Sequence, residues 1–404
     1  ALELSGINDE FEVPPDAPYK LERDSNGKLT GVLRSGRSLL KHESNTKSPS
    51  DEERVEQLKK LVQDYNSVGI TSVSDRNAGD SAVAIWKTLH EADALNVRVF
   101  LYYSMNARAE PQVIQKRIDA AAADPIHQYN PYLWLRGVKV FLDGGMLTGS
   151  AYMRKPWGVS KIYSINDPQY RGMRYIDQER LYQFSKLMLK NGFQMTAHSV
   201  GDGAVHALLD AYRLIDQDDF KVASHRPCIT HCNFMSADAI ALMSKLGVVA
   251  DLQPAWLYMD GKTLLKQFGL ERTEYFQPYR SLFDKGVVIG GGSDHMQRIG
   301  SLRSVNPYNP FLGMWITLKR QPRYMSTSLH PEQSLTRQEA LRLYTINNAY
   351  LTFEEQEKGS IEKGKLADMV VLDRDILKVE LDKIKDTKVE TTYLGGKVVY
   401  QRPR

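Results

Sequence analysis

One arrangement recurs four times along the 404-residue chain. A helix-like segment ends near a glycine, a short apolar run follows, and a polar or chemically active residue comes directly after that run. The four copies lie at residues 67–75, 190–198, 245–253 and 284–294. An apolar run of this length, bounded by glycine, is typical of a strand buried in a parallel sheet. The repeat therefore predicts βα units that carry polar residues at the carboxyl ends of their strands.

The alternation of helices and strands continues between these copies. Further apolar runs at Val97–Tyr102, Val138–Leu142 and 228–232 follow helical patterns, which gives seven predicted strands between residues 70 and 294. Seven strands with intervening helices fit a (β/α)8 barrel better than an open sheet. We therefore expect an α/β fold, a TIM-type barrel whose first strand is missing from this chain.

The sequence divides into three regions that differ in composition and in the pattern of apolar residues. Residues 1–50 are polar and are expected to form a lead-in segment that packs on the barrel. Residues 51–353 would form the barrel, strands two to eight, and a long aromatic-rich stretch within it, 296–333, would form a lid or a substrate wall. Residues 354–404 contain short strand patterns and a hairpin turn at Gly395-Gly396. This last region is expected to be the C-terminal part of a small β-sandwich domain.

Composition excludes several classes of partner. The chain has 53 Lys and Arg against 49 Asp and Glu, a balance that argues against nucleic acid and anionic membranes. No apolar run approaches the ~20 residues of a membrane-spanning helix, and the absence of a signal-peptide pattern favours the cytoplasm. Cys228 and Cys232 cannot form a disulfide framework and are expected to pack around His231. A small-molecule substrate is the expected partner, and homo-oligomer formation is left open.

Four side chains with ligand chemistry follow predicted strands, namely Lys139, His198, His231 and Asp294. A barrel brings the carboxyl ends of its strands to one mouth, so these groups would converge there. Neutral imidazoles and a carboxylate suit Zn²⁺ or a similar divalent ion. Each histidine has a plainer interpretation as a packed core residue, which is the commoner case for a single histidine on a strand.

Lys139 alternates with apolar neighbours, which would turn its side chain toward the barrel interior. A lone buried ammonium is unfavourable by several kcal/mol. The lysine could pair with Asp143, or extend to the mouth of the barrel. It could instead be chemically modified, or act as a metal-site or Schiff-base amine.

Five motifs together resemble the metal-dependent amidohydrolase superfamily, and within it the YtcJ-like branch that includes N-substituted formamide deformylases. The motifs are VKVFLDGG at 138–145, TAHSVGDGAVHALLDAY at 196–212, RPCITHCNF at 226–234, GGSDH at 291–295 and GSIEKGKLADMVVLD at 359–373. The resemblance runs over nearly the whole chain. It implies a distorted (β/α)8 barrel with a composite β-sandwich.

The resemblance also implies roles for the four side chains. Lys139 matches a lysine that can be carboxylated to bridge metal ions, and His198 and His231 match metal-binding histidines. Asp294 matches the aspartate that binds metal and takes the proton from the attacking water. One or two divalent ions, zinc above all, would then be the cofactor. We further expect substrate contacts from Asp143, Gly144, Trp256 and His295.

One family element has no counterpart here. Members carry a His-x-His pair at the end of strand one, and no such pair occurs in these 404 residues. We expect a further N-terminal segment to supply it. The leading hypothesis is a hydrolase that cleaves an amide-type or formamide-type C–N bond. The alternatives are a non-catalytic binding or regulatory protein, a truncated inactive fragment, and a Schiff-base lyase that uses Lys139.

Overall fold

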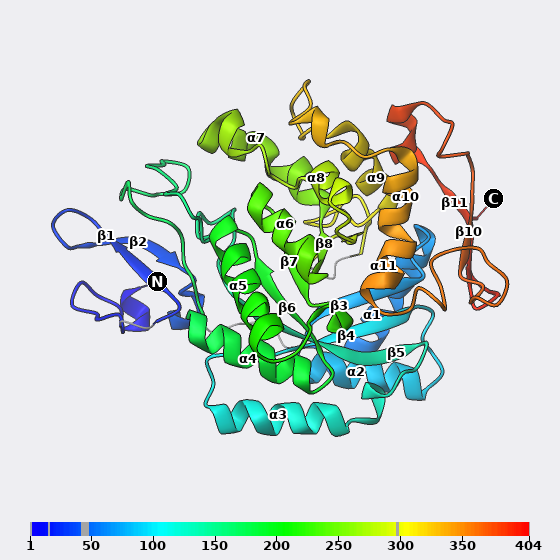
Figure 1. The fold of residues 1–404 in the computed structure, drawn as a ribbon, viewed down its shortest axis with the longest axis horizontal. Helices are drawn as coiled ribbons and strands as arrows, with labels where there is room; N and C mark the ends of the chain where they lie inside the picture. Colours follow the sequence, from blue (N-terminus) through cyan, green and yellow to red (C-terminus); the bar gives the residue numbers. More distant parts are fainter. Residues whose placement is uncertain (1, 15–16, 42–47, 296–298, 404) are drawn as a thin grey trace.

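The computed structural model describes residues 2–14, 17–41, 48–295 and 299–403. Its centre is a seven-stranded parallel sheet in which each strand pairs with the next one along the chain (Figure 1). In spatial order the strands are β3 (Ser72–Ala78), β4 (Arg98–Ser104), β5 (Leu133–Phe141), β6 (Gln194–Ser199), β7 (Cys228–His231), β8 (Val249–Leu252) and β9 (Ile289–Gly291). The prediction of a curled, TIM-type parallel sheet with seven strands is confirmed.

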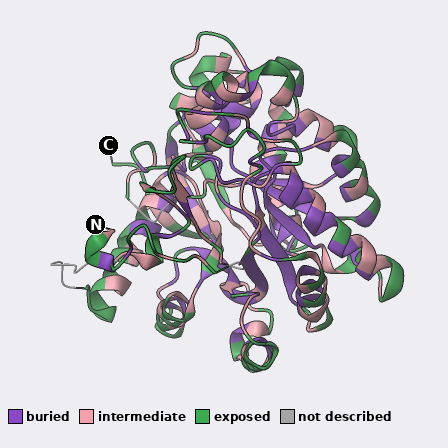
Figure 2. Cartoon of the chain, turned by 90° about the vertical axis from the view of Figure 1, so that its left-hand side faces the viewer, coloured by how far each residue is buried: buried purple, intermediate pink, exposed green. Residues whose placement is uncertain are grey.

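Helices connect the strands and cover the outer face of the sheet. They are α1 (Asp51–Ser67), α2 (Asp80–Glu91), α3 (Pro111–Ala123), α4 (Gln178–Lys190), α5 (Asp202–Asp218), α6 (Ala237–Leu246) and α8 (Tyr279–Asp284). The first begins with a capping box, in which Ser50 and Glu53 satisfy each other's backbone N–H groups. Figure 2 shows buried strands, with exposed residues on the outward sides of the helices. This burial is expected for helices that are apolar on the side facing the sheet and polar on the other.

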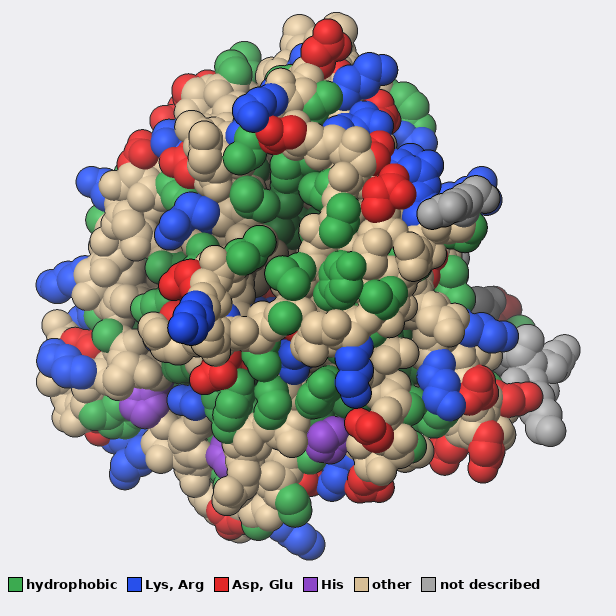
Figure 3. All heavy atoms as spheres, turned by 90° about the vertical axis from the view of Figure 1, so that its right-hand side faces the viewer, with side chains coloured by type: hydrophobic (Ala, Val, Ile, Leu, Met, Phe, Trp, Pro, Cys, Tyr) green, Lys and Arg blue, Asp and Glu red, His purple; other side chains and the backbone are tan. Residues whose placement is uncertain are grey.

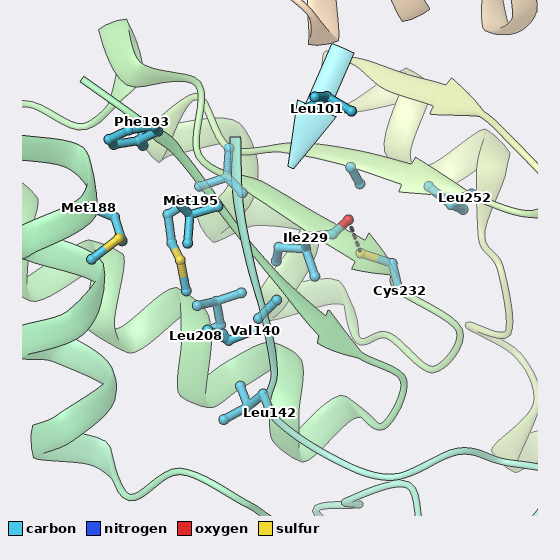
Figure 4. Close-up of a cluster of buried hydrophobic side chains, with 14 of the residues drawn as sticks. Leu101, Val140, Leu142, Met188, Phe193, Met195, Leu208, Ile229, Cys232 and Leu252 are labelled. Carbon is cyan, nitrogen blue, oxygen red and sulfur yellow. Dashed lines mark hydrogen bonds between the residues drawn. The ribbon is translucent and has the colours of Figure 1, made fainter. Parts of the chain in front are cut away.

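The main core lies between the sheet and the helices. Val140 of β5, Met195 of β6 and Ile229 of β7 pack with Met188 of α4 and Leu208 of α5 (Figure 4). All five are almost fully buried, and such side chains each contribute about 1.5–3 kcal/mol of hydrophobic stabilisation. Side chains alternate across a strand, so residues between these positions face the opposite side of the sheet.

A second group of helices lies at the carboxyl ends of the strands: α7 (Pro254–Arg272), α9 (Pro310–Lys319), α10 (Arg337–Tyr344) and α11 (Ile346–Leu351). The prediction of a long loop over 296–333 is wrong for α9, and residues 296–298 lie outside the described part of the chain. Residues 311–317 are all buried, so this helix has no polar face whose periodicity could have revealed it.

The chain ends in a three-stranded antiparallel sheet, β10 (Met369–Leu372), β11 (Val389–Leu394) and β12 (Lys397–Gln401). Its predicted hairpin turn is confirmed, since Gly395 and Gly396 join β11 to β12 with φ of 55° and 79°. Arg98 of β4 anchors this sheet through a paired ion contact with Asp368, at 2.6 and 2.8 Å.

The lead-in segment forms a hairpin, β1 (Lys20–Arg23) and β2 (Leu29–Arg34), on the side of the molecule opposite the C-terminal sheet (Figure 1). Arg34 is buried and donates to the carbonyls of Thr148, Tyr163 and Ser164, in the long connection after β5. Among the described residues, no helix combines the length and the apolar character needed to cross a membrane.

Candidate active site

A pocket of about 1500 Å³ opens between the two edge strands of the parallel sheet. It is lined by residues 68–77, which lead into and form β3, and by residues 291–295, which follow β9. Apolar residues of the C-terminal sheet, Met369 and Val370, also line it. Figure 3 shows hydrophobic side chains gathered around a hollow on the face that carries this sheet. The pocket is therefore bounded by the edge strands β3 and β9 as well as by side chains.

Two histidines meet at its floor. His198 of β6 and His231, the last residue of β7, lie with Nδ1 of the first 2.9 Å from Nε2 of the second. Burial lowers the pKa of both imidazoles, that of His231 to about 3, and the charge of Lys139 lowers both further. Both rings are therefore neutral near pH 7, the form that binds metal.

The outer nitrogen of each ring faces an acceptor. Nδ1 of His231 lies 2.7 Å from Oε1 of Gln253, so this nitrogen carries the proton. Nε2 of His198 faces the Gly144 carbonyl at 3.5 Å and Oδ1 of Asp143 at 3.8 Å. In the metal-free chain Nδ1 of His198 donates to the lone pair on Nε2 of His231 at 2.9 Å. When that proton moves to Nε2 of His198, the two inner nitrogens present convergent lone pairs to a shared cation.

The spacing of these nitrogens fits a metal ion. Two nitrogens bonded to one zinc at ~2.0–2.1 Å, with roughly right-angled to tetrahedral geometry, are about 3.0–3.4 Å apart. The 2.9 Å separation between His198 and His231 is close to this range. No group of three His, Cys, Asp or Glu side chains suited to metal binding occurs in the described residues. In the described chain the two imidazoles therefore converge without a third side chain of these types beside them.

Lys139 lies on the inner face of β5, as the alternation predicted, and only 4% of it is exposed. Its ammonium lies 5.2 Å from the centre of the Phe141 ring. Burial lowers the pKa of this amine to about 8, an effect that the carboxylates of Asp251 and Asp294 oppose. The alternative of an ion pair with Asp143 is wrong: no such contact joins the two described residues, and that carboxylate accepts from backbone amides instead.

Asp294 follows β9 and lines the pocket. Its φ of 51° is in the left-handed region, which is unfavourable for a residue other than glycine, and His231 has a φ of 88°. Such strain is concentrated at functional sites. Burial raises the pKa of the Asp294 carboxyl to about 6, although the Lys139 charge and the Trp256 indole lower it.

The four expected substrate contacts fall into two groups. Asp143 is not among the pocket-lining residues; its carboxylate accepts from the backbone N–H groups of Tyr152, Val200 and Gly201 at 2.9–3.0 Å. Gly144 is also outside the lining and is packed so closely that a Cβ would lie 2.3 Å from the Ser150 hydroxyl. These two positions brace the loop that follows β5.

Trp256 and His295 do line the pocket. Trp256 lies near the start of α7, beside Asp294. His295 is held at both ring nitrogens, by the Tyr65 hydroxyl at 2.8 Å and by the Ser293 hydroxyl at 3.3 Å. Burial lowers the pKa of His295 to about 4, so the ring is neutral at pH 7. Trp256 is thus the freer of the two to contact a substrate.

Residues 1–400 match the amidohydrolase family. The chain belongs to the amidohydrolase family. An N-substituted formamide deformylase of Arthrobacter pascens is 27% identical over 411 residues, which cover all of this chain and 70% of that protein. The putative amidohydrolase YtcJ of Bacillus subtilis (strain 168) is 24% identical over 274 residues, 67% of this chain and 48% of that protein. The matched part of this amidohydrolase therefore covers about half the length of YtcJ.

The fold of this amidohydrolase is also that of solved relatives. An uncharacterised metal-dependent hydrolase from Pyrococcus horikoshii OT3 superposes with a TM-score of 0.68 at 22% identity, over 94% of this chain and 69% of that one. A zinc complex of the atrazine chlorohydrolase TrzN from Arthrobacter aurescens TC1 gives a TM-score of 0.54 at 16% identity, over 85% and 72%. Both support the same barrel architecture.

Sequence reasoning did not single out three polar residues of this amidohydrolase: Asp251 and Gln253, which are buried, and Arg76, which is partly buried. Nε of Arg76 lies 2.8 Å from Oδ2 of Asp251, and Gln253 contacts both Asp251 and His231. A signal was present in the sequence VVADLQ. Asp251 and Gln253 alternate there with Ala250 and Leu252, which places the polar pair on the inner face of the strand.

Proposed function

We propose that this chain acts as a metal-dependent hydrolase that cleaves an amide-type or formamide-type C–N bond of a small molecule. The observation that carries the proposal is the pair of convergent, neutral imidazole nitrogens of His198 and His231 beside a buried lysine and a strained aspartate. The similarity to a formamide deformylase supports the choice of bond. The large, largely apolar pocket is consistent with an N-substituted substrate.

Each side chain has a proposed role. Nδ1 of His198 and Nε2 of His231 would hold a divalent ion such as zinc, and Asp294 would provide a carboxylate to the same centre. When bound, the ion would supply a water of lowered pKa and polarise the substrate carbonyl. Asp294 takes a proton from the attacking water as its oxygen adds to the carbonyl carbon. It then delivers that proton to the nitrogen as the C–N bond breaks.

Lys139 would contribute an oxygen ligand after modification. Its pKa of about 8 leaves part of the amine neutral near physiological pH, and a neutral amine adds to CO2 with loss of a proton. The resulting carbamate replaces a buried positive charge by a negative one next to the histidines. Bicarbonate in the medium should therefore strengthen metal binding by the chain.

We further propose that the gap between β9 and β3 receives another strand, which brings the His-x-His ligands that the 404 residues lack. Both edge strands line the pocket, and in the described chain they are paired on one side only. The exposed apolar residues Val370 and Val371 of β10 lie on the C-terminal sheet beside this gap. Unpaired edges and apolar surface of this kind favour the addition of a strand.

A second candidate is a non-catalytic binding protein with the amidohydrolase fold. It is favoured by the absence, from the described residues, of a three-ligand group of His, Cys, Asp or Glu. The two candidates differ in metal content and turnover.

The test is elemental analysis of the chain after incubation with Zn²⁺ and bicarbonate, followed by assays with N-substituted formamides and simple amides. Bound zinc at one or two ions per chain, with amine release that a His231→Ala variant lacks, is the expected result. If the chain bound no metal and showed no turnover, even after addition of a peptide that supplies the first strand, the result would support the binding protein instead.

A further inference from the structure

The geometry points to Gln253 as the positioning residue of His231: its side-chain amide selects the tautomer that leaves the Nε2 lone pair facing His198. The tautomer itself is independent of the proposed function, whereas its use in metal binding rests on that function. Gln253 follows β8 directly and is 3% exposed. It is neither one of the four proposed active-site side chains nor on the strand that carries His231.

Three contacts fix the direction of the Gln253 amide. Nε2 of Gln253 lies 3.1 Å from the backbone carbonyl of Asp251 and 3.3 Å from its carboxylate Oδ2. Both partners are acceptors, so the NH2 group must point to Asp251. The carbonyl Oε1 then points to Nδ1 of His231, at 2.7 Å. An amide oxygen can only accept, and the proton of the neutral imidazole is therefore held on Nδ1.

Asp251 is in turn held by a charge on the far edge of the sheet. Nε of Arg76, on β3, lies 2.8 Å from Oδ2 of Asp251, and the guanidinium packs 4.3 Å from the centre of the Tyr102 ring. The side chains of Arg76 and Asp251 are 15% and 9% exposed. A chain of contacts thus runs from β3 through β8 to His231 on β7. It directs the Asp251 carboxylate at the Gln253 NH2 group, and the Arg76 charge opposes the burial that raises the pKa of Asp251.

The backbone of Gln253 is also secured. Its carbonyl accepts from Nε2 of Gln277 at 2.8 Å. A rotated Gln253 amide would set NH2 against the Nδ1 proton and an oxygen against the Asp251 carboxylate, and both contacts would be repulsive. Partners of this kind, which hold a metal-binding histidine from its other nitrogen, change metal affinity by about 10- to 100-fold when they are removed.

The tautomer can be read directly by NMR of metal-free protein labelled with ¹⁵N at histidine. Two-bond ¹H–¹⁵N spectra distinguish a protonated from an unprotonated ring nitrogen, and a His231→Ala variant assigns the signals. We expect His231 to be protonated at Nδ1 in the unmodified chain. Gln253→Met should abolish this preference, and Gln253→Glu should keep it because a carboxylate still accepts from Nδ1.

Metal affinity is measured on the same variants with Co²⁺ alone. Gln253→Met should weaken Co²⁺ binding by about 10- to 100-fold, and Gln253→Glu by less. Gln194→Leu is the matched control, since it removes another buried glutamine amide, one that contacts Tyr102 and two backbone carbonyls but neither histidine. It should lower thermal stability and leave the His231 tautomer unchanged.

The outcomes separate the two proposals. A His231 ring protonated at Nε2 in the unmodified chain, or a Gln253→Met variant with an unchanged tautomer, would overturn the positioning role. If the Gln253→Met variant fails to fold, the positioning role is tested by the His231 tautomer of the unmodified chain and of the Gln253→Glu variant. The predicted tautomer in a chain that binds no Co²⁺ would uphold the positioning role and count against the proposed hydrolase.

Discussion

Nδ1 of His198 and Nε2 of His231 lie 2.9 Å apart across two adjacent parallel strands, and each ring is engaged from its other nitrogen. We expect substitution of either residue by alanine to weaken Co²⁺ or Zn²⁺ binding at least ~100-fold, since one of two described imidazole ligands is lost. Titration followed by the visible absorption of Co²⁺ measures this. His206→Ala, on α5, removes a histidine that contacts Ser236 and Arg154 instead, and should leave the affinity unchanged.

The buried carboxyl of Asp294 gives the proposed reaction a pH dependence. Its pKa is raised to about 6, and only the ionised form can take a proton from water. We expect kcat/KM to rise about tenfold per pH unit below pH 6 and to level off above it. Asp294→Asn should reduce the rate at least ~100-fold and remove this limb of the profile. A variant that keeps both the rate and the limb would exclude Asp294 as the base.

Lys139 makes the stability of the metal-free chain depend on pH in the alkaline range. Its pKa is about 8 when folded and ~10.4 when unfolded, so between these values the unfolded chain binds more protons and stability increases with pH. Relative to Lys139→Met, the free energy of unfolding should increase by about 3 kcal/mol across this window. Urea unfolding in bicarbonate-free buffer measures it, with Lys190→Met, at an exposed site on α4, as the control. Parallel pH curves for the unmodified chain and Lys139→Met would contradict the buried ammonium.

The ion pair between Arg98 and Asp368 should be a large contributor to the attachment of the C-terminal sheet. Both side chains are nearly inaccessible, at 2% and 6% exposure, and the contact is bidentate. Arg98→Met leaves a buried, unpaired carboxylate and should lower stability by about 3–5 kcal/mol. The double variant Arg98→Met/Asp368→Leu should recover much of this loss. Guanidinium unfolding of the three variants tests the coupling, and a single variant within 1 kcal/mol of the unmodified chain would refute it.

The barrel could be predicted from the sequence because each βα unit is marked by residues that are close together along the chain. The helix, glycine and strand pattern marks each βα unit independently, and Gly69, Gly192, Gly247 and Gly286 all adopt the positive φ that ends the preceding helix. Lys139 could be assigned to the inner face because Val138 and Val140 on either side are core residues. Residues 337–351 form two helices, α10 and α11, rather than one, because Thr345 leaves the helical region with ψ of −101°.

Only part of the site could be predicted from the sequence, because the polar residues behind the histidines are brought together by contacts between strands. Nothing local in the sequence tells that Gln253 meets His231 or that Arg76 meets Asp251, since these pairs are 22 and 175 residues apart. The helix α7 was missed as well: Gly261 stands on its buried face and Gly269, near its end, has a non-helical φ of 75°, and glycines of this kind weaken a helical pattern. Pairing across the sheet, rather than spacing along the chain, decides these features.

The order of strands in the parallel sheet has a consequence for the way the chain folds during its synthesis. Every strand of that sheet pairs with the one that follows it, so each new βα unit can dock on a neighbour that the ribosome has already released. Paired residues of neighbouring strands lie 21 to 57 positions apart along the chain, so each pairing can form once the next βα unit is complete. Other contacts must wait for distant residues, among them the one from Arg76 to Asp251 and the ion pair from Arg98 to Asp368. The support that Arg76 and Asp251 give to the proposed site should accordingly mature late, after most of the barrel has formed.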